Sequence, residues 1–261
     1  MSHNETTSSQ EMALAHVLAD AAGEVLRARF RKPLNLERKG DSSPVTEADR
    51  AAESAMAALI RARFPDHGIF GEEHARENAE SRWQWVLDPI DGTRAFLAGY
   101  PTFTTLIALC LDGAPVLGVI DQPFLRERWT AEAGGVTLLN GERVRAQARR
   151  LEDAVLATTS SDYFTPAQAA AYAKLRARCA SAIAGGDAYA SAMLASGCVG
   201  AVVDAALKPY DYCALVPIVE GAGGVITDWR GKPLTLDSDG SLAAACCPEA
   251  HRAMLAELGK Q

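Results

Sequence analysis

Hydrophobic and polar residues alternate along this chain in two periods, one helical and one typical of β-strands. Apolar residues recur at helical spacing from Gln10 to Arg31, with arginines in the last turns, and predict a first helix. A second helix is predicted over Thr46–Phe64, because Thr46 is a suitable N-cap and Asp49 stands three residues after it. The polar residues 1–9 predict a disordered tail before these helices.

Short β-rich runs follow these helices, and the second half of the chain alternates strands with helices. Asp112-Gly113 separates two such runs and predicts a tight hairpin. The alternation indicates layered α/β packing. The predicted strands are Gly68–Phe70, Trp83–Leu87, Thr102–Leu111, Ala114–Asp121, Arg126–Ala131, Val136–Leu139, Val155–Thr159, Ala182–Ala184, Val199–Asp204 and Gly224–Thr227. The predicted helices of this part are Pro166–Arg178, Asp187–Ser196 and Tyr210–Ala222.

The chain shows neither an internal repeat nor a low-complexity linker, so a single unit over residues 10–261 is expected. The nearest candidate boundary is the arginine-rich stretch Ala146–Glu152. It would divide the unit into two subdomains, of about residues 10–148 and 149–261.

Composition narrows the class of protein. With 261 residues, of which 48% are hydrophobic, the chain is long enough to bury a sizeable core. The net charge of −7 and the lack of a basic face predict no nucleic-acid partner. No apolar run is long enough to span a bilayer, and no secretory signal is visible, so we expect a cytoplasmic protein without a membrane partner. The six cysteines lack zinc-site spacing and are expected to be reduced.

The most informative segment ends the strand predicted at Trp83–Leu87. Asp88 and Asp91 follow it on a turn made by Pro89 and Gly92, so their carboxylates can converge, which is costly for unpaired charges. A divalent cation removes that cost, and Mg²⁺ prefers carboxylate and carbonyl oxygens. The amides of Gly92 and Thr93, opening a short helix to about Ala98, could bind a phosphate. A β-turn followed by an Asp-capped helix is the alternative.

Three other groups of residues are ambiguous when each is considered alone. Glu72 and Glu73, after Gly71 at the end of a predicted strand, could simply be a solvated surface. Asp49 and Asp211 each stand in the first turn of a predicted helix, where capping is sufficient to explain them.

Together these segments resemble the inositol monophosphatase family of metal-dependent phosphatases. The resemblance runs from about Lys39 to Leu234, and its blocks follow the order of the family. It implies an α/β (α+β) fold, the layered αβαβα sandwich, and hydrolysis of a phosphate monoester with two or three Mg²⁺ ions. It also implies a homodimer and sensitivity to lithium. The four blocks are Pro44-Val45-Thr46-Glu47-Ala48-Asp49, Gly71-Glu72-Glu73, Asp88-Pro89-Ile90-Asp91-Gly92-Thr93, and Tyr210-Asp211 followed by Glu220-Gly221-Ala222-Gly223-Gly224.

The resemblance also implies roles for individual residues. Asp49 and Thr93 would hold and deprotonate the attacking water, with help from Glu72, and the amides of Gly92 and Thr93 would bind the phosphate. The implied metal ligands are Glu72, Asp88, the backbone oxygen of Ile90, Asp91 and Asp211.

Further segments are similar to the histidinol-phosphate phosphatase branch of the family. The substrate of that branch has an ammonium and an imidazole beside its phosphate, so its site should offer carboxylates near the metals. Asp187 and Asp204 are the candidates, and Arg94 is a third candidate contact. A helix N-cap explains Asp187 equally well, a solvated strand end explains Asp204, and Arg94 could be structural. The similar segments are Arg94-Ala95-Phe96-Leu97 with the following Gly99-Tyr100-Pro101, Gly185-Gly186-Asp187-Ala188-Tyr189-Ala190, and Leu207-Lys208-Pro209-Tyr210-Asp211-Tyr212-Cys213-Ala214-Leu215-Val216-Pro217.

Other functions remain open at this point. The same scaffold could hydrolyse inositol-1-phosphate, a range of sugar phosphates or, more remotely, a nucleotide 3′-phosphate. The chain could also be a catalytically silent regulator that binds metal or a phosphorylated ligand. A purely structural protein with exposed acidic clusters would show no change of melting temperature with Mg²⁺.

Overall fold

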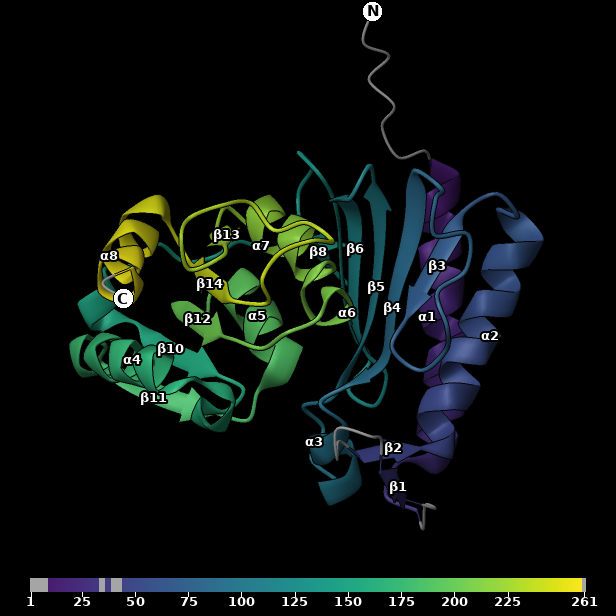
Figure 1. Cartoon of the computed structure of the whole chain (residues 1–261), viewed down its shortest axis with the longest axis horizontal. Helices are drawn as coiled ribbons and strands as arrows, with labels where there is room; N and C mark the ends of the chain where they lie inside the picture. The colour runs from purple at the N-terminus through teal and green to yellow at the C-terminus, as the bar shows by residue number, and fades with distance from the viewer. Residues whose placement is uncertain (1–8, 33–35, 39–43, 260–261) are drawn as a thin grey trace, which may run out of the picture.

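Five alternating layers of helices and sheets make up the protein (Figure 1). The computed structural model describes residues 9–32, 36–38 and 44–259. The predicted αβαβα sandwich is confirmed. The predicted tail over residues 1–9 lies outside the described residues except for Ser9, which is the first residue of helix α1.

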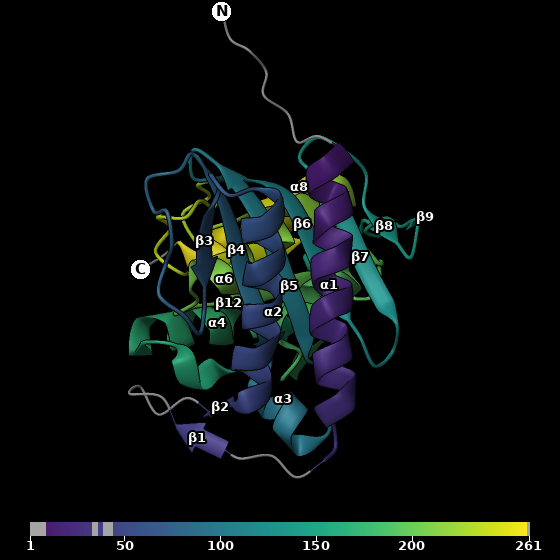
Figure 2. The ribbon, with the colours of Figure 1, turned by 90° about the vertical axis from the view of Figure 1, so that its right-hand side faces the viewer.

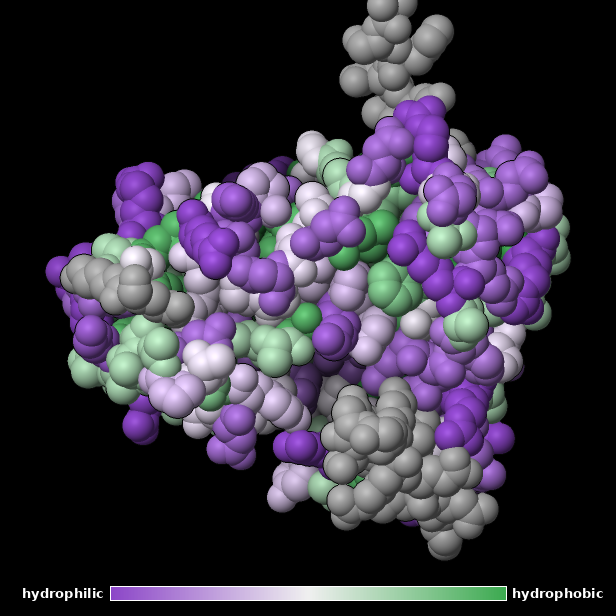
Figure 3. Space-filling view, viewed as in Figure 1, coloured by the Kyte–Doolittle hydropathy of each residue, from purple (hydrophilic) through white to green (hydrophobic). Residues whose placement is uncertain are grey.

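The first layer consists of α1 (Ser9–Arg29) and α2 (Glu47–Arg63), which lie side by side on one face of the larger sheet (Figure 2). Their buried apolar residues pack against Trp85, Leu87 and Ile107 of that sheet. Hydrophilic residues cover most of the face in Figure 3, including the outer side of α2, as expected for an amphipathic helix. None of the described helices has the length and apolar character of a membrane span.

The second layer is a sheet of seven strands in the order β3-β4-β5-β6-β7-β8-β9. Only β3 and β4 are parallel; the other neighbouring strands are antiparallel. The hairpin predicted at Asp112-Gly113 is confirmed, and both residues have the positive φ, 49° and 84°, that a type I′ turn requires. The strands are β3 (Gly68–Gly71), β4 (Trp83–Asp91), β5 (Thr104–Leu111), β6 (Ala114–Gln122), β7 (Glu127–Glu132), β8 (Leu138–Leu139) and β9 (Glu142–Arg143).

Between the two sheets lie α5 (Asp187–Ala195), α6 (Pro209–Tyr212) and α7 (Leu215–Gly221). The single helix predicted over Tyr210–Ala222 is wrong, because α6 ends before α7 begins. Pro217 explains the division: it lacks an N–H and would interrupt a continuous helix, but it is tolerated in the first turn of α7.

The fourth layer is a sheet of five strands in the order β11-β10-β12-β14-β13, and α4 (Pro166–Arg178) and α8 (Pro248–Leu258) cover its outer face. Sequence patterns predicted neither β14 nor α8. β14 is a run of one leucine and three alanines, which have weak strand propensity, yet it pairs on both edges. The strands are β10 (Val155–Thr158), β11 (Ser181–Ala184), β12 (Ala201–Asp204), β13 (Val225–Thr227) and β14 (Leu242–Ala245).

The remaining elements are short: β1 (Leu36–Arg38) pairs with β2 (Pro44–Thr46), and 3-10 turns span Leu151–Asp153 and Ser161–Tyr163. The boundary predicted near residue 148 lies between the two sheets and stays a prediction, because one core cluster packs against both. α3 (Thr93–Ala98) ends where predicted. β4 continues four residues beyond its predicted end at Leu87, so it includes Asp88 and Asp91; other predicted ends differ by at most two residues.

Candidate active site

A cavity of about 250 Å³ opens where the end of β4 meets α3, the start of α5 and the segment from β12 into α6. It draws on both halves of the chain, from Glu72 to Asp211. Nine of the residues proposed from the sequence line it: Glu72, Asp88, Ile90, Asp91, Gly92, Thr93, Arg94, Asp187 and Asp211. Asp49 and Asp204 are not among the described residues that line this cavity.

A β-bulge in β4 lets Asp88 and Asp91 face the same site. Side chains alternate along a strand, so residues three apart point to opposite faces. Here Asp88 pairs with Leu106 and Asp91 with Thr104, so β4 contains one residue more than β5 over this stretch. The extra residue restores a common face, which is a frequent use of bulges at functional sites.

Backbone N–H groups orient the convergent carboxylates, so the fold itself fixes the positions of these side chains. Each of three aspartates accepts a hydrogen bond at one carboxylate oxygen. The donor to Asp91 lies in the first turn of α5, so this bond joins the two halves of the chain at the site. The bonds are Ile90 N–H to Asp88 Oδ1 at 2.9 Å, Ala188 N–H to Asp91 Oδ2 at 2.8 Å, and Lys208 N–H to Asp211 Oδ2 at 2.7 Å.

The electrostatics of this cluster favour a cation. One oxygen each from Asp88, Asp91 and Asp211 lies within 4.8 Å of the others. Burial and neighbouring carboxylates raise the pKa of Asp88 and Asp91 well above the usual range, and raise that of Asp211 to about 7. Among the described residues that line the cavity, five have a carboxylate and only two have a cationic side chain. A divalent cation would remove this repulsion, so the residues fit one.

Glu72 and Asp49 lie next to this cluster. The Glu72 backbone N–H donates to the Leu87 carbonyl at 3.2 Å, so the Glu72 loop is tied to β4 just before Asp88. Asp49 is fully buried, and its Oδ2 accepts from the N–H and the hydroxyl of Thr46. Its Oδ1 has no partner among the described residues. Burial is the main cause that raises the Asp49 pKa, and Glu72 adds to it.

Gly92 joins β4 to α3, whose first residue is Thr93, and both residues line the cavity. Gly92 has a φ of 80°, which favours glycine, and a Cβ there would also make a tight contact of 3.1 Å with Asp187 Oδ2. The Thr93 hydroxyl donates to the Ile90 carbonyl at 3.1 Å, which orients both groups beside Asp91.

Asp187 and Arg94 also line the cavity. Asp187 begins α5 with a φ of 44°; burial raises its pKa, which the Arg94 charge lowers in part. The Arg94 guanidinium lies over the Tyr163 ring, 5.4 Å from its centroid. Tyr163 is 42% exposed, so this pair presents a planar surface beside the acidic cluster.

Asp204 does not line the cavity and is only 6% exposed. Its Oδ1 accepts from the Thr159 N–H at 2.6 Å and from the Thr158 hydroxyl at 3.0 Å. Burial raises its pKa to about 7. Thr159 does line the cavity, so Asp204 meets the site through Thr159, and the solvated strand end considered as an alternative is wrong.

Sequence analysis did not single out Thr159, Tyr163 or Lys208, all of which line the cavity. Lys208 lies in the segment that resembles the histidinol-phosphate branch, and this place in the sequence was the feature that could have identified it as a site residue. Thr159 and Tyr163 follow β10 in an ordinary polar loop, and no pattern in the sequence distinguishes them.

Comparisons with known proteins identify the family of this chain. A sequence model of the inositol monophosphatase family matches residues 8–261. The bifunctional phosphatase IMPL2 of Arabidopsis thaliana is 46% identical over 92% of this chain and 70% of its own length. A histidinol-phosphatase of Chlorobaculum parvum is 38% identical over 90% of this chain and 92% of its own.

Solved structures point the same way. The structure of an inositol monophosphatase from Zymomonas mobilis superposes with a TM-score of 0.88 at 44% identity, covering 97% of this chain and 100% of the other. A match over nearly the whole chain accounts for the fold. The chain therefore belongs to the inositol monophosphatase family and is a phosphatase.

Proposed function

We propose that this phosphatase requires Mg²⁺ and hydrolyses L-histidinol phosphate to L-histidinol and phosphate. The observation behind the proposal is the convergence of Asp88, Asp91 and Asp211 in a cavity that Asp187 also lines. The first three provide cation ligands, and the fourth provides a negative charge for an ammonium group. Relatives named histidinol-phosphatase, 33–38% identical to this chain, support the substrate.

Two or three Mg²⁺ ions would be held by oxygens of the residues that the structure brings together. The ligands would be Glu72, Asp88, the Ile90 carbonyl, Asp91 and Asp211. When bound, Mg²⁺ supplies positive charge that neutralises phosphate oxygens and makes a neighbouring water more acidic.

Asp49 and Thr93 would handle the attacking water. The Thr93 hydroxyl donates to the Ile90 carbonyl, so its oxygen remains available to accept a hydrogen bond from the water. Asp49 has an unpartnered Oδ1 and a raised pKa, which suit it to accept the proton released as the water attacks phosphorus. The backbone amides of Gly92 and Thr93 would orient the phosphate for in-line displacement.

The remaining part of the substrate would meet Asp187, Arg94 and Tyr163. The ammonium of histidinol phosphate would pair with the Asp187 carboxylate. Its imidazole would pack on the planar Arg94–Tyr163 pair. Asp204 would act indirectly, by fixing the Thr159 backbone at the cavity wall.

A second substrate class is supported by the comparisons themselves. IMPL2 is named a bifunctional phosphatase, and the Zymomonas mobilis structure is named an inositol monophosphatase. Inositol-1-phosphate or a range of sugar phosphates could therefore be the better substrate. A catalytically silent regulator is the less favoured alternative, because every residue expected of the reaction is present. A homodimer, lithium sensitivity and a cytoplasmic location remain predictions from the sequence.

The test is a steady-state comparison of histidinol phosphate, inositol-1-phosphate and a sugar phosphate, each with Mg²⁺ and with EDTA. We expect Mg²⁺-dependent turnover and the highest kcat/KM for histidinol phosphate. Faster turnover of inositol-1-phosphate would refute the substrate but not the mechanism. Equal rates in Mg²⁺ and EDTA would refute the metal requirement.

A further inference from the structure

Glu53 is a buried acidic residue outside the cavity, and neither the motifs nor the proposed chemistry accounts for it. It lies on α2 one turn after Asp49, so both side chains emerge from the same face of the helix. Its exposure is 1%, although a buried carboxylate is costly unless it is well hydrogen-bonded.

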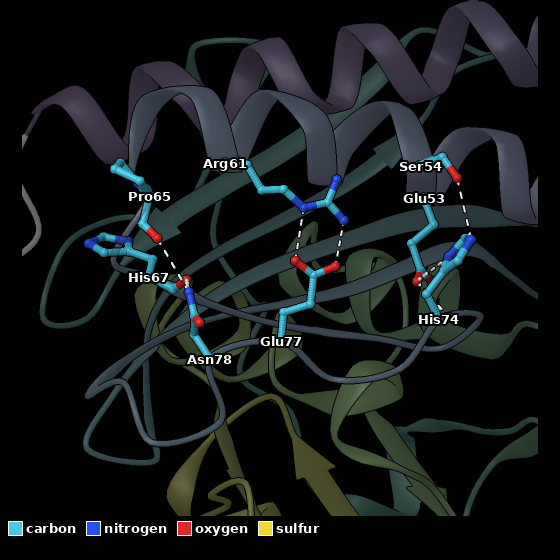
Figure 4. Close-up of polar contacts among 8 residues, drawn as sticks. All are labelled: Glu53, Ser54, Arg61, Pro65, His67, His74, Glu77 and Asn78. Atoms are coloured by element: carbon cyan, nitrogen blue, oxygen red, sulfur yellow. Dashed lines mark hydrogen bonds and ion pairs between the residues drawn. The ribbon is translucent and has the colours of Figure 1, made fainter.

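The hydrogen-bond partners of Glu53 among the described residues belong to the loop that contains Glu72. Glu53 Oε2 accepts from the backbone N–H of Glu73 at 2.8 Å, and Oε1 accepts from the backbone N–H of His74 at 2.9 Å. The His74 Nδ1 also lies 2.9 Å from Oε1, and Figure 4 shows the two side chains meeting below α2. Both carboxylate oxygens are therefore engaged by the residues that directly follow Glu72.

Gly71 leaves the space that this carboxylate occupies. A Cβ on Gly71 would overlap the Glu53 carboxylate, so any larger residue would force Glu53 off the loop. This contact explains the glycine that precedes Glu72. It also shows that the loop and the helix side chain fit each other closely.

The loop is thus held from two sides. On one side the Glu72 N–H donates to the Leu87 carbonyl of β4, next to Asp88. On the other side Glu53 binds the next two amides. We propose that Glu53 is a positioning residue that fixes the loop after β3, so that the Glu72 carboxylate faces the cavity before any cation binds. This inference rests on the proposed role of Glu72 as a metal ligand.

Glu53→Gln tests it with almost no change of shape. Glutamine offers one acceptor oxygen and one NH₂ group, so one of the two loop amides would face a donor and lose its partner. Changes to groups that orient metal ligands typically weaken metal affinity about 10- to 100-fold, and we expect this range for Mg²⁺. If Glu53 acts by positioning, saturating Mg²⁺ should restore most of kcat.

Glu77→Gln is the matched control. Glu77 lies on the same loop and pairs with Arg61 of α2, but that pair is exposed, with side-chain exposures of 36% and 53% (Figure 4). Exposed pairs contribute little, so its Mg²⁺ dissociation constant should stay within about two-fold of wild type. Calorimetric titration of both variants gives the comparison. Equal dissociation constants for Glu53→Gln and Glu77→Gln would overturn the proposal, even if Glu53→Gln lowered the melting temperature.

Hydrogen exchange on the wild-type protein tests the same idea without depending on the folding of a variant. The amides of Glu73 and His74 should be protected in EDTA as well as in Mg²⁺. Protection that appears only after Mg²⁺ is added would overturn the proposal, because the cation would then order the loop. A wild-type protein that binds no Mg²⁺ would instead refute the proposed function, while the exchange in EDTA would still decide whether Glu53 holds the loop.

Discussion

Replacing Asp211 with asparagine should stabilise the metal-free protein and weaken its response to Mg²⁺. The asparagine would keep a side-chain oxygen that can accept from the Lys208 N–H. The local structure should therefore survive. The substitution removes the negative charge of Asp211, which is repelled by the carboxylates of Glu72, Asp88 and Asp91.

The magnitude follows from the pKa of Asp211, which rises from 3.8 to about 7, mainly through burial. A raised carboxyl pKa means that folding favours the protonated form. The Asp211 carboxyl therefore contributes fully to the stability of the folded protein below its pKa in the unfolded chain. This contribution is lost as the pH rises through about 7, its pKa in the folded protein. At pH 8 the full rise corresponds to roughly 4 kcal/mol. Because neighbouring carboxylates share the protons, we expect Asp211→Asn to recover about 1–4 kcal/mol.

Urea unfolding in EDTA at pH 5, 6, 7 and 8 measures this directly. The wild-type free energy of unfolding should fall over the range, and the variant should lose less of it. Asp112→Asn is the control, since Asp112 is exposed, pairs with Arg82 and has a lowered pKa. It should leave the slope between pH 5 and 8 unchanged. An Asp211→Asn protein less stable than wild type in EDTA at pH 8 would refute the account of charge repulsion.

Three further predictions concern the reaction and the metal. Asp91→Asn and Thr93→Ala should each lower kcat by about 100-fold or more, because each removes a group that stabilises the transition state. Steady-state kinetics measures the loss, and circular dichroism should show that both variants stay folded. Near-normal turnover in either variant would contradict the mechanism. Asp187→Asn should raise the KM for histidinol phosphate about 10-fold, because a charge-assisted hydrogen bond to its ammonium group is lost. The KM for a sugar phosphate, which has no ammonium group, should stay nearly unchanged. Equal effects on both KM values would exclude Asp187 as the ammonium partner. Mg²⁺ at 100 times its dissociation constant should raise stability by about 2.7 kcal/mol, measured as a higher Tm, whereas NaCl of matched ionic strength in EDTA buffer should not.

The sequence predicted most of the fold, because its strands and helices are strongly patterned. It did not predict β14, whose alanines have no strand signature; β14 is ordered by pairing with β12 and β13 and by packing against α8. It also predicted one helix where Pro217 divides two. These failures share a cause: tertiary packing decides the state of segments whose local preference is weak.

The candidate site was predictable as a set of residues but not as a geometry. Asp49 and Asp211 each accept a backbone N–H in the first turn of a helix through Oδ2, as the capping interpretation predicts. This does not exclude a role in the site, because Asp211 also belongs to the acidic cluster and Asp49 Oδ1 has no partner among the described residues. The bulge that brings Asp88 and Asp91 together depends on pairing with β5, which the local sequence does not reveal. Glu53 had a weak signal, a charged residue within the buried face of α2.

The structure of a crystal grown with Mn²⁺ in place of Mg²⁺, using anomalous scattering to locate the ions, tests the central claim most directly. The account predicts anomalous peaks between Asp88, Asp91 and Asp211, each within coordination distance of their carboxylate oxygens. A fully occupied crystal in which these carboxylates share no ion would contradict it.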